Sequence, residues 1–209
     1  MTLPAGIEEV TIGGETRLAT EGPPVYGEPT VDGWRVWGAG RSKLAAMIEV
    51  GLPVQFDAAT MALYLGAGAG TTVSHLADAL DRVYAVEFAP RPGRRLLTVA
   101  KEREAIIPLL KDARRPETYS HVVESDCGLL VQDLATVDQA RIAAAHRPFL
   151  ADGATVAVSI KARSEDVTAE VSSVFETALE VLDETYDVVE HARLEPYHDD
   201  HLGIVARVD

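Results

Sequence analysis

The stretch Met61 to Gly70, MALYLGAGAG, decides the fold. It is an apolar run that breaks into three glycines at alternate positions, Gly66, Gly68 and Gly70. The residues that follow, from Thr71 on, are typical of a helix start. A strand that ends in glycines lets the backbone approach a ligand closely, and the first turn of a helix offers it free N–H groups. The pattern predicts a nucleotide-binding loop.

The spacing of the glycines indicates which ligand this loop binds. A dinucleotide fingerprint, G-x-G-x-x-G, would place its third glycine at position 71, where the chain has Thr71. Here the third glycine, Gly70, comes one residue earlier, a form typical of S-adenosylmethionine sites. The spacing therefore favours S-adenosylmethionine and weakens the alternative of a nicotinamide-dependent dehydrogenase.

Strands and helices alternate after this point. Apolar runs predict strands at 62–65, 83–88, 105–110, 128–132, 154–160, 188–194 and 202–208, and helices near 72–80, 93–103, 137–146 and 166–184. Such alternation predicts an α/β fold with a mostly parallel sheet covered on both faces. Residues 195–201 are too few for a crossover helix, so the last strand should run antiparallel. We therefore expect a Rossmann-like, seven-stranded methyltransferase sheet.

The N-terminal part has a different pattern. Apolar and polar residues alternate around Ile7, Val10 and Ile12, and Gly13-Gly14 is typical of a hairpin turn. A helix should follow, with Ser42 as its N-cap. We expect a small β-rich cap with a connecting helix over 1–55 and the methyltransferase domain over 56–209.

Composition narrows the setting of the protein. The lone cysteine, Cys127, excludes an intramolecular disulfide and lies among apolar residues that predict burial. No apolar run approaches the ~20 residues of a membrane span, so we expect a soluble, cytoplasmic protein. The net charge is −14, and lysines number only four. This surface favours a protein of a halophile, where salt screens repulsion between acids, over an ordinary acidic cytosolic protein.

Positive charge is concentrated in one region. Between residues 91 and 115, eight basic residues stand against three acidic ones. The basic residues are Arg91, Arg94, Arg95, Lys101, Arg103, Lys111, Arg114 and Arg115. This island is a candidate anion-binding face, with an arginine-rich helix surface that has no partner as the alternative.

Candidate cofactor residues follow the predicted strands, because ligands of open parallel sheets bind beyond the carboxyl ends of the strands. Glu87 lies 21 residues after Gly66, the distance at which an acid can accept hydrogen bonds from both ribose hydroxyls of an adenosine. Phe88 is a candidate to stack on the adenine ring. Asp112, followed by Ala113, is a candidate acceptor for the adenine amino group.

Two further polar residues end the neighbouring strands near the expected reactive end. Lys161 interrupts an apolar strand, and a buried lysine needs an anionic partner. Asp133, at the end of the adjacent strand, is the expected partner. Together they would orient a substrate hydroxyl for attack on a methyl group, with the lysine stabilising or accepting charge as the proton leaves.

The histidines predict no metal site. His198 and His201 flank two aspartates, but methyl transfer from a sulfonium needs no metal. The other four are interpreted as surface or helix-end residues: His75, His121, His146 and His191.

Several longer segments resemble one family. They are WRVWGAGRSKLAA (34–46), YLGAGAGTTVSHLAD (64–78), VYAVEFAPRPGRRL (83–96), IIPLLKDARRPETY (106–119), DQARI (138–142), SIKA (159–162) and LEPYHDDH (194–201). In this order they resemble archaeal fibrillarin, the rRNA/tRNA 2′-O-ribose methyltransferase of box C/D guide ribonucleoproteins. The resemblance covers most of the chain from Trp34 to His201.

The resemblance implies roles for individual residues. Lys43, Asp133 and Lys161 fall on the family's active-site lysines and aspartate, and Asp133 also on its cofactor site. Thr71 and Thr72 should line the methionine end of S-adenosylmethionine. Whether Lys43 serves the cofactor carboxylate or an RNA phosphate stays open. The family usually follows the aspartate with Val-Ala-Gln-Pro, whereas this chain continues Leu-Ala-Thr-Val, so a contact from Thr136 in place of the glutamine also stays open.

The resemblance also implies partners: a guide box C/D RNA, its rRNA or tRNA target, a Nop-type scaffold protein and, indirectly, a kink-turn-binding ribosomal-type protein. The glycine- and arginine-rich leader of eukaryotic relatives is not in this sequence. A catalytically idle scaffold subunit of the same particle is the alternative from another class, and Lys43, Asp133 and Lys161 argue against it.

Overall fold

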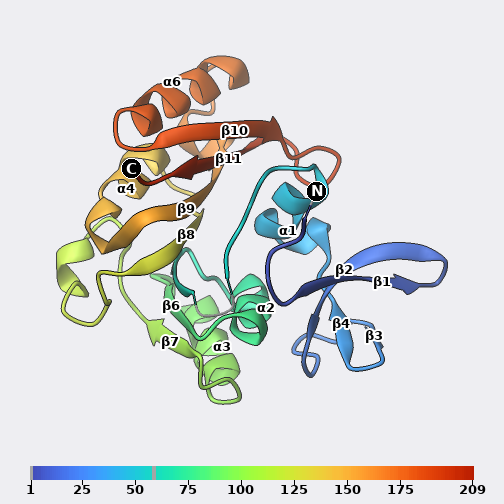
Figure 1. Cartoon of the computed structure of the whole chain (residues 1–209). Helices are drawn as coiled ribbons and strands as arrows, with labels where there is room; N and C mark the ends of the chain where they lie inside the picture. Colours follow the sequence, from blue (N-terminus) through green and yellow to red (C-terminus); the bar gives the residue numbers. More distant parts are fainter. Residues whose placement is uncertain (1, 58–59) are drawn as a thin grey trace.

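Two β-sheets organise the chain in the computed structural model, which describes residues 2–57 and 60–209 (Figure 1). The smaller sheet has the strand order β1-β2-β4-β3, and the larger has the order β10-β11-β9-β8-β5-β6-β7. The small sheet lies to one side of the large one, beside helix α2 (Figure 1). This arrangement matches the expected seven-stranded sheet with an N-terminal β-rich part.

The N-terminal sheet is antiparallel throughout. It consists of β1 (Ile7–Ile12), β2 (Glu15–Glu21), β3 (Thr30–Val31) and β4 (Trp34–Val36), and the turn η1 (Ala39–Arg41) follows. Gly13 and Gly14 form the predicted hairpin turn with positive φ angles of 60° and 84°. Helix α1 (Lys43–Glu49) then begins as predicted, because the Ser42 side chain accepts a hydrogen bond from the Ala45 N–H.

The seven strands of the large sheet fall close to their predicted positions. They are β5 (Met61–Leu65), β6 (Arg82–Val86), β7 (Ile106–Leu109), β8 (Cys127–Asp133), β9 (Leu150–Lys161), β10 (Asp187–Arg193) and β11 (His201–Arg207). Strands β5 to β9 are parallel, and β11 pairs antiparallel with both β9 and β10. The antiparallel last strand is confirmed.

The helices differ more from the prediction. They are α2 (Thr71–Ala79), α3 (Pro90–Ala100), α4 (Gln139–Ala144), α5 (Ala162–Glu165) and α6 (Val171–Asp183), with short turns η2 (Pro116–Thr118) and η3 (Arg147–Phe149). The predicted helix at 166–184 is wrong at its start. The Asp166 carboxylate accepts hydrogen bonds from the N–H groups of Thr168 and Ala169, which favours a turn there over a helix.

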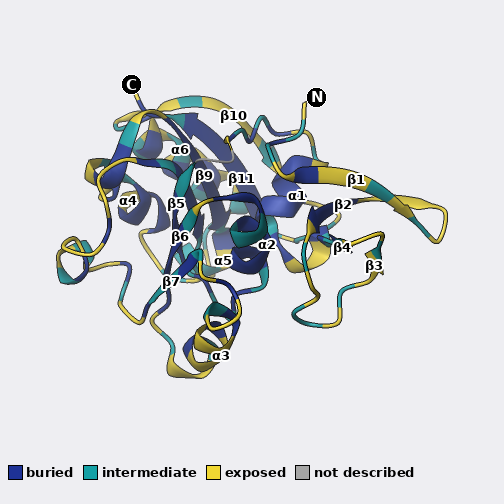
Figure 2. Cartoon of the chain, turned by 60° about the horizontal axis from the view of Figure 1, so that its bottom comes forward, coloured by how far each residue is buried: buried dark blue, intermediate teal, exposed yellow. Residues whose placement is uncertain are grey.

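Two hydrophobic clusters cover the two faces of the large sheet. The central strands of this sheet are accordingly buried (Figure 2). One cluster joins α1, α2 and α3 to one face, with Leu96 and Val99 of α3 buried in it. The other joins α4 and α6 to the opposite face, where Phe175 and the predicted core residue Cys127 are buried. None of the helices in the described ranges has the length and apolar character to cross a bilayer.

Buried polar groups attach the small sheet to α2. The guanidinium of Arg35, fully buried, forms an ion pair with Asp78 at 2.6 Å, and Asp78 also binds Arg103 at 2.9 Å. Thr20 of β2 shares a hydrogen bond of 2.7 Å with the ring of His75. The interpretation of His75 as a surface or helix-end residue is therefore wrong, since its side chain is sealed between β2 and α2.

His146 lies at a helix end, as expected, but it is not a surface residue. It is fully buried, and its ring nitrogens contact the Tyr119 hydroxyl at 2.6 Å and the Ile142 carbonyl at 2.7 Å. Burial lowers its pKa, so a neutral ring completes the core beneath η3. A sequence pattern does not distinguish such a histidine from an exposed one at a helix end.

Candidate functional site

A cavity of about 570 Å³ opens at the carboxyl ends of the parallel strands. Its lining includes eight of the residues predicted from the sequence: Lys43, Gly66, Gly68, Glu87, Phe88, Asp112, Ala113 and Asp133. Seven further residues complete it: Val86, Ala89, Lys111, Arg114, Leu134, Ala135 and Thr136. The predicted residues Gly70, Thr71, Thr72 and Lys161 are not among the residues that line this cavity.

Gly66 lets the loop after β5 pass close to the end of β8. Its φ angle is +84°, and a Cβ added there would lie 2.2 Å from the carbonyl oxygen of Asp133. A side chain at this position would meet both the steric cost of a positive φ and a clash with rigid backbone. Gly68, with φ +57°, has open space where a Cβ would stand, so the loop presents bare backbone to the cavity.

Glu87 is held in place by the loops beside it. One carboxylate oxygen accepts a hydrogen bond of 2.7 Å from the Gly68 N–H, and the other accepts one of 2.6 Å from the Ala89 N–H. The carboxylate is nearly buried and lines the cavity. Each oxygen has a second lone pair, so the group can still accept hydrogen bonds from two ligand hydroxyls.

The region predicted to hold adenine contains an arginine that the sequence interpretation did not place there. The Arg114 guanidinium forms an ion pair with Asp112 at 2.6 Å and lies 5.9 Å from the ring centre of Phe88. The hydrogen bonds from Arg114 are the main reason why the pKa of the Asp112 carboxyl lies below its usual value. Asp112 therefore presents a charged carboxylate already bound on one side, while Phe88, 67% exposed, stands at the rim.

Asp133 has a different cationic partner from the one predicted. Its Oδ2 lies 3.1 Å from Nζ of Lys43, at the start of α1. Lys161 forms no ion pair within 4.0 Å among the described residues, and it is partly exposed at the end of β9. The expected Lys161–Asp133 pair is wrong, because the strand end leaves the ammonium group access to water and removes the need for a buried anion.

A buried glutamine that the sequence interpretation missed fixes the backbone of Lys161. The Gln139 side chain accepts a hydrogen bond of 2.9 Å from the Lys161 N–H and donates one of 3.1 Å to its carbonyl. Gln132 of β8 in turn donates a 2.8 Å hydrogen bond to the Gln139 carbonyl. No spacing rule singles out Gln139, since a glutamine at a helix start is usually solvated.

The start of α2 is coupled to the start of α1. Gly70 is the N-cap of α2, with φ +86°, and Thr71 is its first residue. The Thr72 hydroxyl is buried and donates a hydrogen bond of 2.9 Å to the hydroxyl of Ser42, the N-cap of α1. The threonines therefore link the glycine loop to the helix that carries Lys43.

The hairpin of β10 and β11 carries two histidines close to the candidate active site. His201 pairs with Lys161 across β11 and β9, and its Nδ1 lies 2.7 Å from the Asp199 carbonyl oxygen. Nε2 of His198 lies 2.8 Å from the carbonyl oxygen of Ala39. Burial is the largest cause of a lowered pKa at His201. No group of three or more potential metal ligands occurs within residues 2–57 and 60–209.

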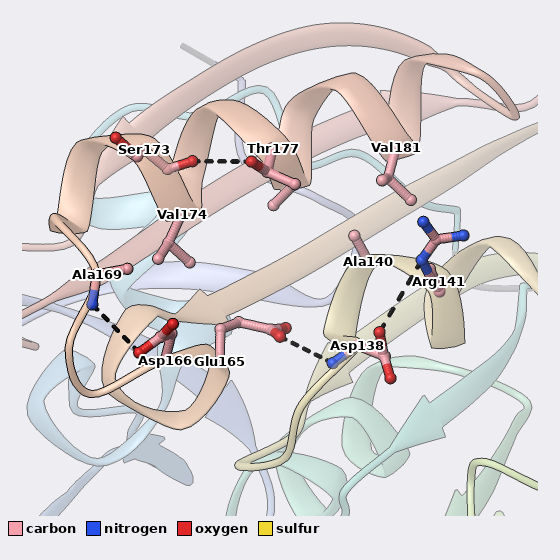
Figure 3. Close-up of a pocket in the computed structure, with 11 residues that line it drawn as sticks. Asp138, Ala140, Arg141, Glu165, Asp166, Ala169, Ser173, Val174, Thr177 and Val181 are labelled. Carbon is pink, nitrogen blue, oxygen red and sulfur yellow. Dashed lines mark hydrogen bonds and ion pairs between the residues drawn. The ribbon is translucent and has the colours of Figure 1, made fainter.

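A second cavity, of about 330 Å³, lies between α4, α5 and α6 (Figure 3). Two of its acidic side chains accept hydrogen bonds from nearby backbone N–H groups. The Glu165 carboxylate accepts hydrogen bonds from the N–H groups of Asp138, at 2.8 Å, and Gln139, at 2.6 Å, and so closes the start of α4 (Figure 3). Asp166 likewise binds the Ala169 N–H. None of the predicted site residues lines this cavity, so the carboxyl-end cavity is the candidate active site.

Comparisons with known proteins single out one family. The family model described as Fibrillarin matches residues 7–209. A protein of Halorubrum lacusprofundi named fibrillarin-like rRNA/tRNA 2′-O-methyltransferase is 58% identical over 204 residues, which cover 98% of this chain and 96% of that protein. The match therefore spans both the small sheet and the large one.

Solved structures agree in fold over the whole chain. Fibrillarin in a crystal structure of a fibrillarin/Nop5p complex is 40% identical, with a TM-score of 0.92 and full coverage of both chains. Fibrillarin of Aeropyrum pernix, solved with natively bound S-adenosyl-L-methionine, is 38% identical, with a TM-score of 0.85 over 99% of this chain and 98% of that one.

Proposed function

The chain belongs to the fibrillarin family, and from this premise we propose that it transfers a methyl group from S-adenosylmethionine to the 2′-hydroxyl of a ribose in rRNA or tRNA. One observation carries the proposal. The Lys43–Asp133 ion pair, the glycine loop and the Glu87 carboxylate line a single cavity at the carboxyl ends of the sheet. This arrangement supports the proposal, because one ligand in the cavity could contact both the Glu87 carboxylate and the Lys43–Asp133 pair.

The cavity fits S-adenosylmethionine by several features. Gly68 leaves bare backbone where a side chain would fill the space, and the Glu87 oxygens each retain a lone pair for a ribose hydroxyl. We assign Phe88 to the face of the adenine ring and Asp112 with Ala113 to its edge. Gly70, Thr71 and Thr72 would shape the methionine end from the start of α2.

The bound cofactor supplies an electrophilic methyl group, and the chain's own residues prepare the ribose oxygen. Asp133 would accept a hydrogen bond from the 2′-hydroxyl and so orient a lone pair of that oxygen. Lys161, at the end of β9, would stabilise the negative charge that develops on this oxygen as its proton passes to the Asp133 carboxylate. Lys43 holds the Asp133 carboxylate in position through its 3.1 Å ion pair.

Thr136 is the residue with which this chain departs from the family's usual glutamine. It lines the cavity together with Leu134 and Ala135. A threonine hydroxyl can both donate and accept a hydrogen bond. We assign it a contact with the cofactor, shorter in reach than that of a glutamine amide.

Target choice would lie with partners. A relative of 40% identity is known in complex with Nop5p, which supports a Nop-type scaffold protein as a direct partner here. A box C/D guide RNA would select the rRNA or tRNA target by base pairing, and a kink-turn-binding ribosomal-type protein would join the particle through that RNA. Ribose methylation suits an RNA duplex, since its shallow minor groove exposes the 2′-hydroxyls.

The experiment compares the isolated chain with the particle assembled from chain, scaffold, kink-turn protein and guide RNA. Mass spectrometry of the target RNA should find one methylated ribose opposite the guide, and almost none with the isolated chain. A particle carrying Lys161→Ala serves as the control for contaminating activity. Guide-independent methylation by the isolated chain at working salt would refute the guided mechanism, and an inactive wild-type particle would refute the activity.

A further inference from the structure

Four exposed arginines stand apart in this acidic protein. Ion pairs engage most of its arginines, for example Arg17 with Glu15 and Arg163 with Asp200. The exposed arginines 41, 91, 94 and 95 form no ion pair within 4.0 Å in the described part of the chain. With 33 acidic residues available, this lack of pairing is a feature of their location and not of composition.

The positions of three of them work against the stability of their helix. Arg91 lies in the first turn of α3, where the helix dipole disfavours a cation and where no acid is present. Arg94 and Arg95 lie three and four residues further on, so all three guanidinium groups share one helix face. Like charges at this spacing destabilise an isolated helix. Their arrangement therefore points to an anionic partner outside the chain.

Three of the eight basic residues in the predicted island are already engaged by acids of the same chain. Arg103 is buried against Asp78, Arg114 is paired with Asp112, and Arg115 is paired with Glu117. Of the charge that is left without an acidic partner, Lys111 lines the candidate active-site cavity and Lys101 ends α3. Arg91, Arg94 and Arg95 share the outer face of α3, which is exposed (Figure 2). This face, and not the segment after Asp112, is the part of the island that is free to bind an anion.

This face continues to the rim of the candidate active site. Helix α3 begins directly after Ala89, which lines the cavity. Tyr26 lies against the glycine loop, because its hydroxyl donates a hydrogen bond of 2.5 Å to the Ala69 carbonyl. The Arg41 guanidinium lies 5.9 Å from the Tyr26 ring centre, and Arg95 is near enough for its charge to act on the Tyr26 phenol.

We propose that Arg41, Arg91, Arg94 and Arg95 form a docking surface for the sugar–phosphate backbone of the guide–target RNA duplex. The inference rests on the proposed function and adds to it the surface that receives the substrate. Guanidinium forks match phosphate oxygens, and a row of like cations on one helix face matches a repeating anion. An RNA strand whose ribose reaches Asp133 would pass Ala89 at the cavity, directly before the helix that carries three of the four arginines.

The test uses the assembled particle with the triple variant Arg91→Gln, Arg94→Gln and Arg95→Gln. Its matched control is Arg17→Gln, Arg141→Gln and Arg193→Gln, which removes the same charge from three exposed arginines that are paired with acids. The first readout is the KM for target RNA as a function of salt. Three lost phosphate contacts should raise the KM at least tenfold at the lowest working salt and flatten the log–log salt slope by about 2 to 3.

The second readout does not depend on methyl transfer. A guide–target duplex with 4-thiouridine is photo-crosslinked within the particle, and the crosslinked peptides are mapped by mass spectrometry. We expect crosslinks to the peptide containing 90–100 in wild type and in the control variant, and their loss in the triple variant. S-adenosylmethionine affinity should be unchanged in all three.

The outcomes are distinct. A triple variant with wild-type KM, salt slope and crosslinks overturns the inference. So does a variant that loses the scaffold protein while its RNA crosslinks persist, because the surface would then bind protein. If the wild-type particle crosslinks through α3 but transfers no methyl group, the proposed activity fails and the docking surface stands.

Discussion

Nζ of Lys43 lies 3.1 Å from Oδ2 of Asp133, which joins the first residue of α1 to the last residue of β8. The cation that faces the candidate catalytic carboxylate thus comes from the segment that connects the two sheets. Ser42 caps α1 and also accepts the Thr72 hydrogen bond from the start of α2. The position of the Asp133 carboxylate relative to its cation therefore depends on the position of α1 as well as on the end of β8.

Lys161 should matter for the chemical step and little for cofactor affinity. We expect Lys161→Ala to reduce single-turnover methyl transfer by the assembled particle about 100-fold or more, in the range of lost general acid–base catalysis. Calorimetry should find the affinity for S-adenosylmethionine nearly unchanged, because Lys161 does not line the cavity. Equal losses in both measurements would reassign Lys161 to cofactor binding, and normal transfer would remove it from catalysis.

Glu87 should contribute mainly to cofactor affinity. Glu87→Ala removes the acceptor that we propose for two ribose hydroxyls and also frees the N–H groups of Gly68 and Ala89. We expect S-adenosylmethionine binding to weaken by about 1 to 3 kcal/mol, measured by calorimetry. Glu104→Ala, an exposed acid outside the cavity, is the matched control. Equal affinities for the two variants would exclude Glu87 from the site.

The residues that the sequence predicted well are those whose position follows from one strand and its parallel neighbours. Glu87, Asp112 and Asp133 lie at or just after the end of a buried strand, and parallel strands bring their carboxyl ends to one edge. The sequence also predicts Lys161 at that edge correctly, but the ion pair that it predicts between Lys161 and Asp133 does not form. Pairing depends on side-chain reach and on access to water, which no strand pattern contains.

Other parts of the site depend on side-chain contacts, several of them between segments that are distant in the sequence. Gln139 binds both backbone groups of Lys161, and Arg114 covers Asp112 beside Phe88. Neither contact follows from hydrophobic periodicity. The predicted helix at 166–184 failed for a local reason, since the Asp166 side chain competes with the helix for backbone N–H groups.

Gly66 should tolerate no side chain. A residue with a Cβ pays about 1 to 2 kcal/mol for the left-handed conformation, and Gly66→Ala also forces the Cβ against the Asp133 carbonyl. Gly13→Ala is the control, since Gly13 has a similar φ of +60° but open space around it. Denaturant unfolding should find Gly66→Ala clearly less stable than Gly13→Ala. If the two lose equal stability, the close approach of the loop to β8 is not rigid.

His75 should make stability depend on pH. Burial, followed by the charges of Arg35 and Arg103, lowers its pKa to about 2. The unfolded chain then binds a proton below about pH 6.5 that the folded chain does not, so stability falls as pH falls, by about 1.4 kcal/mol per unit. Proton uptake on unfolding near pH 5 should drop by about one in His75→Gln. His121→Gln, at an exposed position, is the matched control. Equal drops would contradict a neutral, buried His75.

Stability should fall as salt is lowered, because the net charge of −14 opposes the compact state when it is unscreened. The Debye length grows from about 3 Å at 1 M to about 10 Å at 0.1 M, so repulsion between neighbouring acids returns in this range. Helix α6 carries Glu176, Glu180 and Asp183 on one exposed face, where no basic residue pairs with them in the described structure. We expect the melting temperature to drop steadily between these salt concentrations, and to drop less in a variant with Glu176→Gln, Glu180→Gln and Asp183→Asn. A melting temperature that is flat from molar to millimolar salt would defeat the interpretation of this surface as one adapted to concentrated salt.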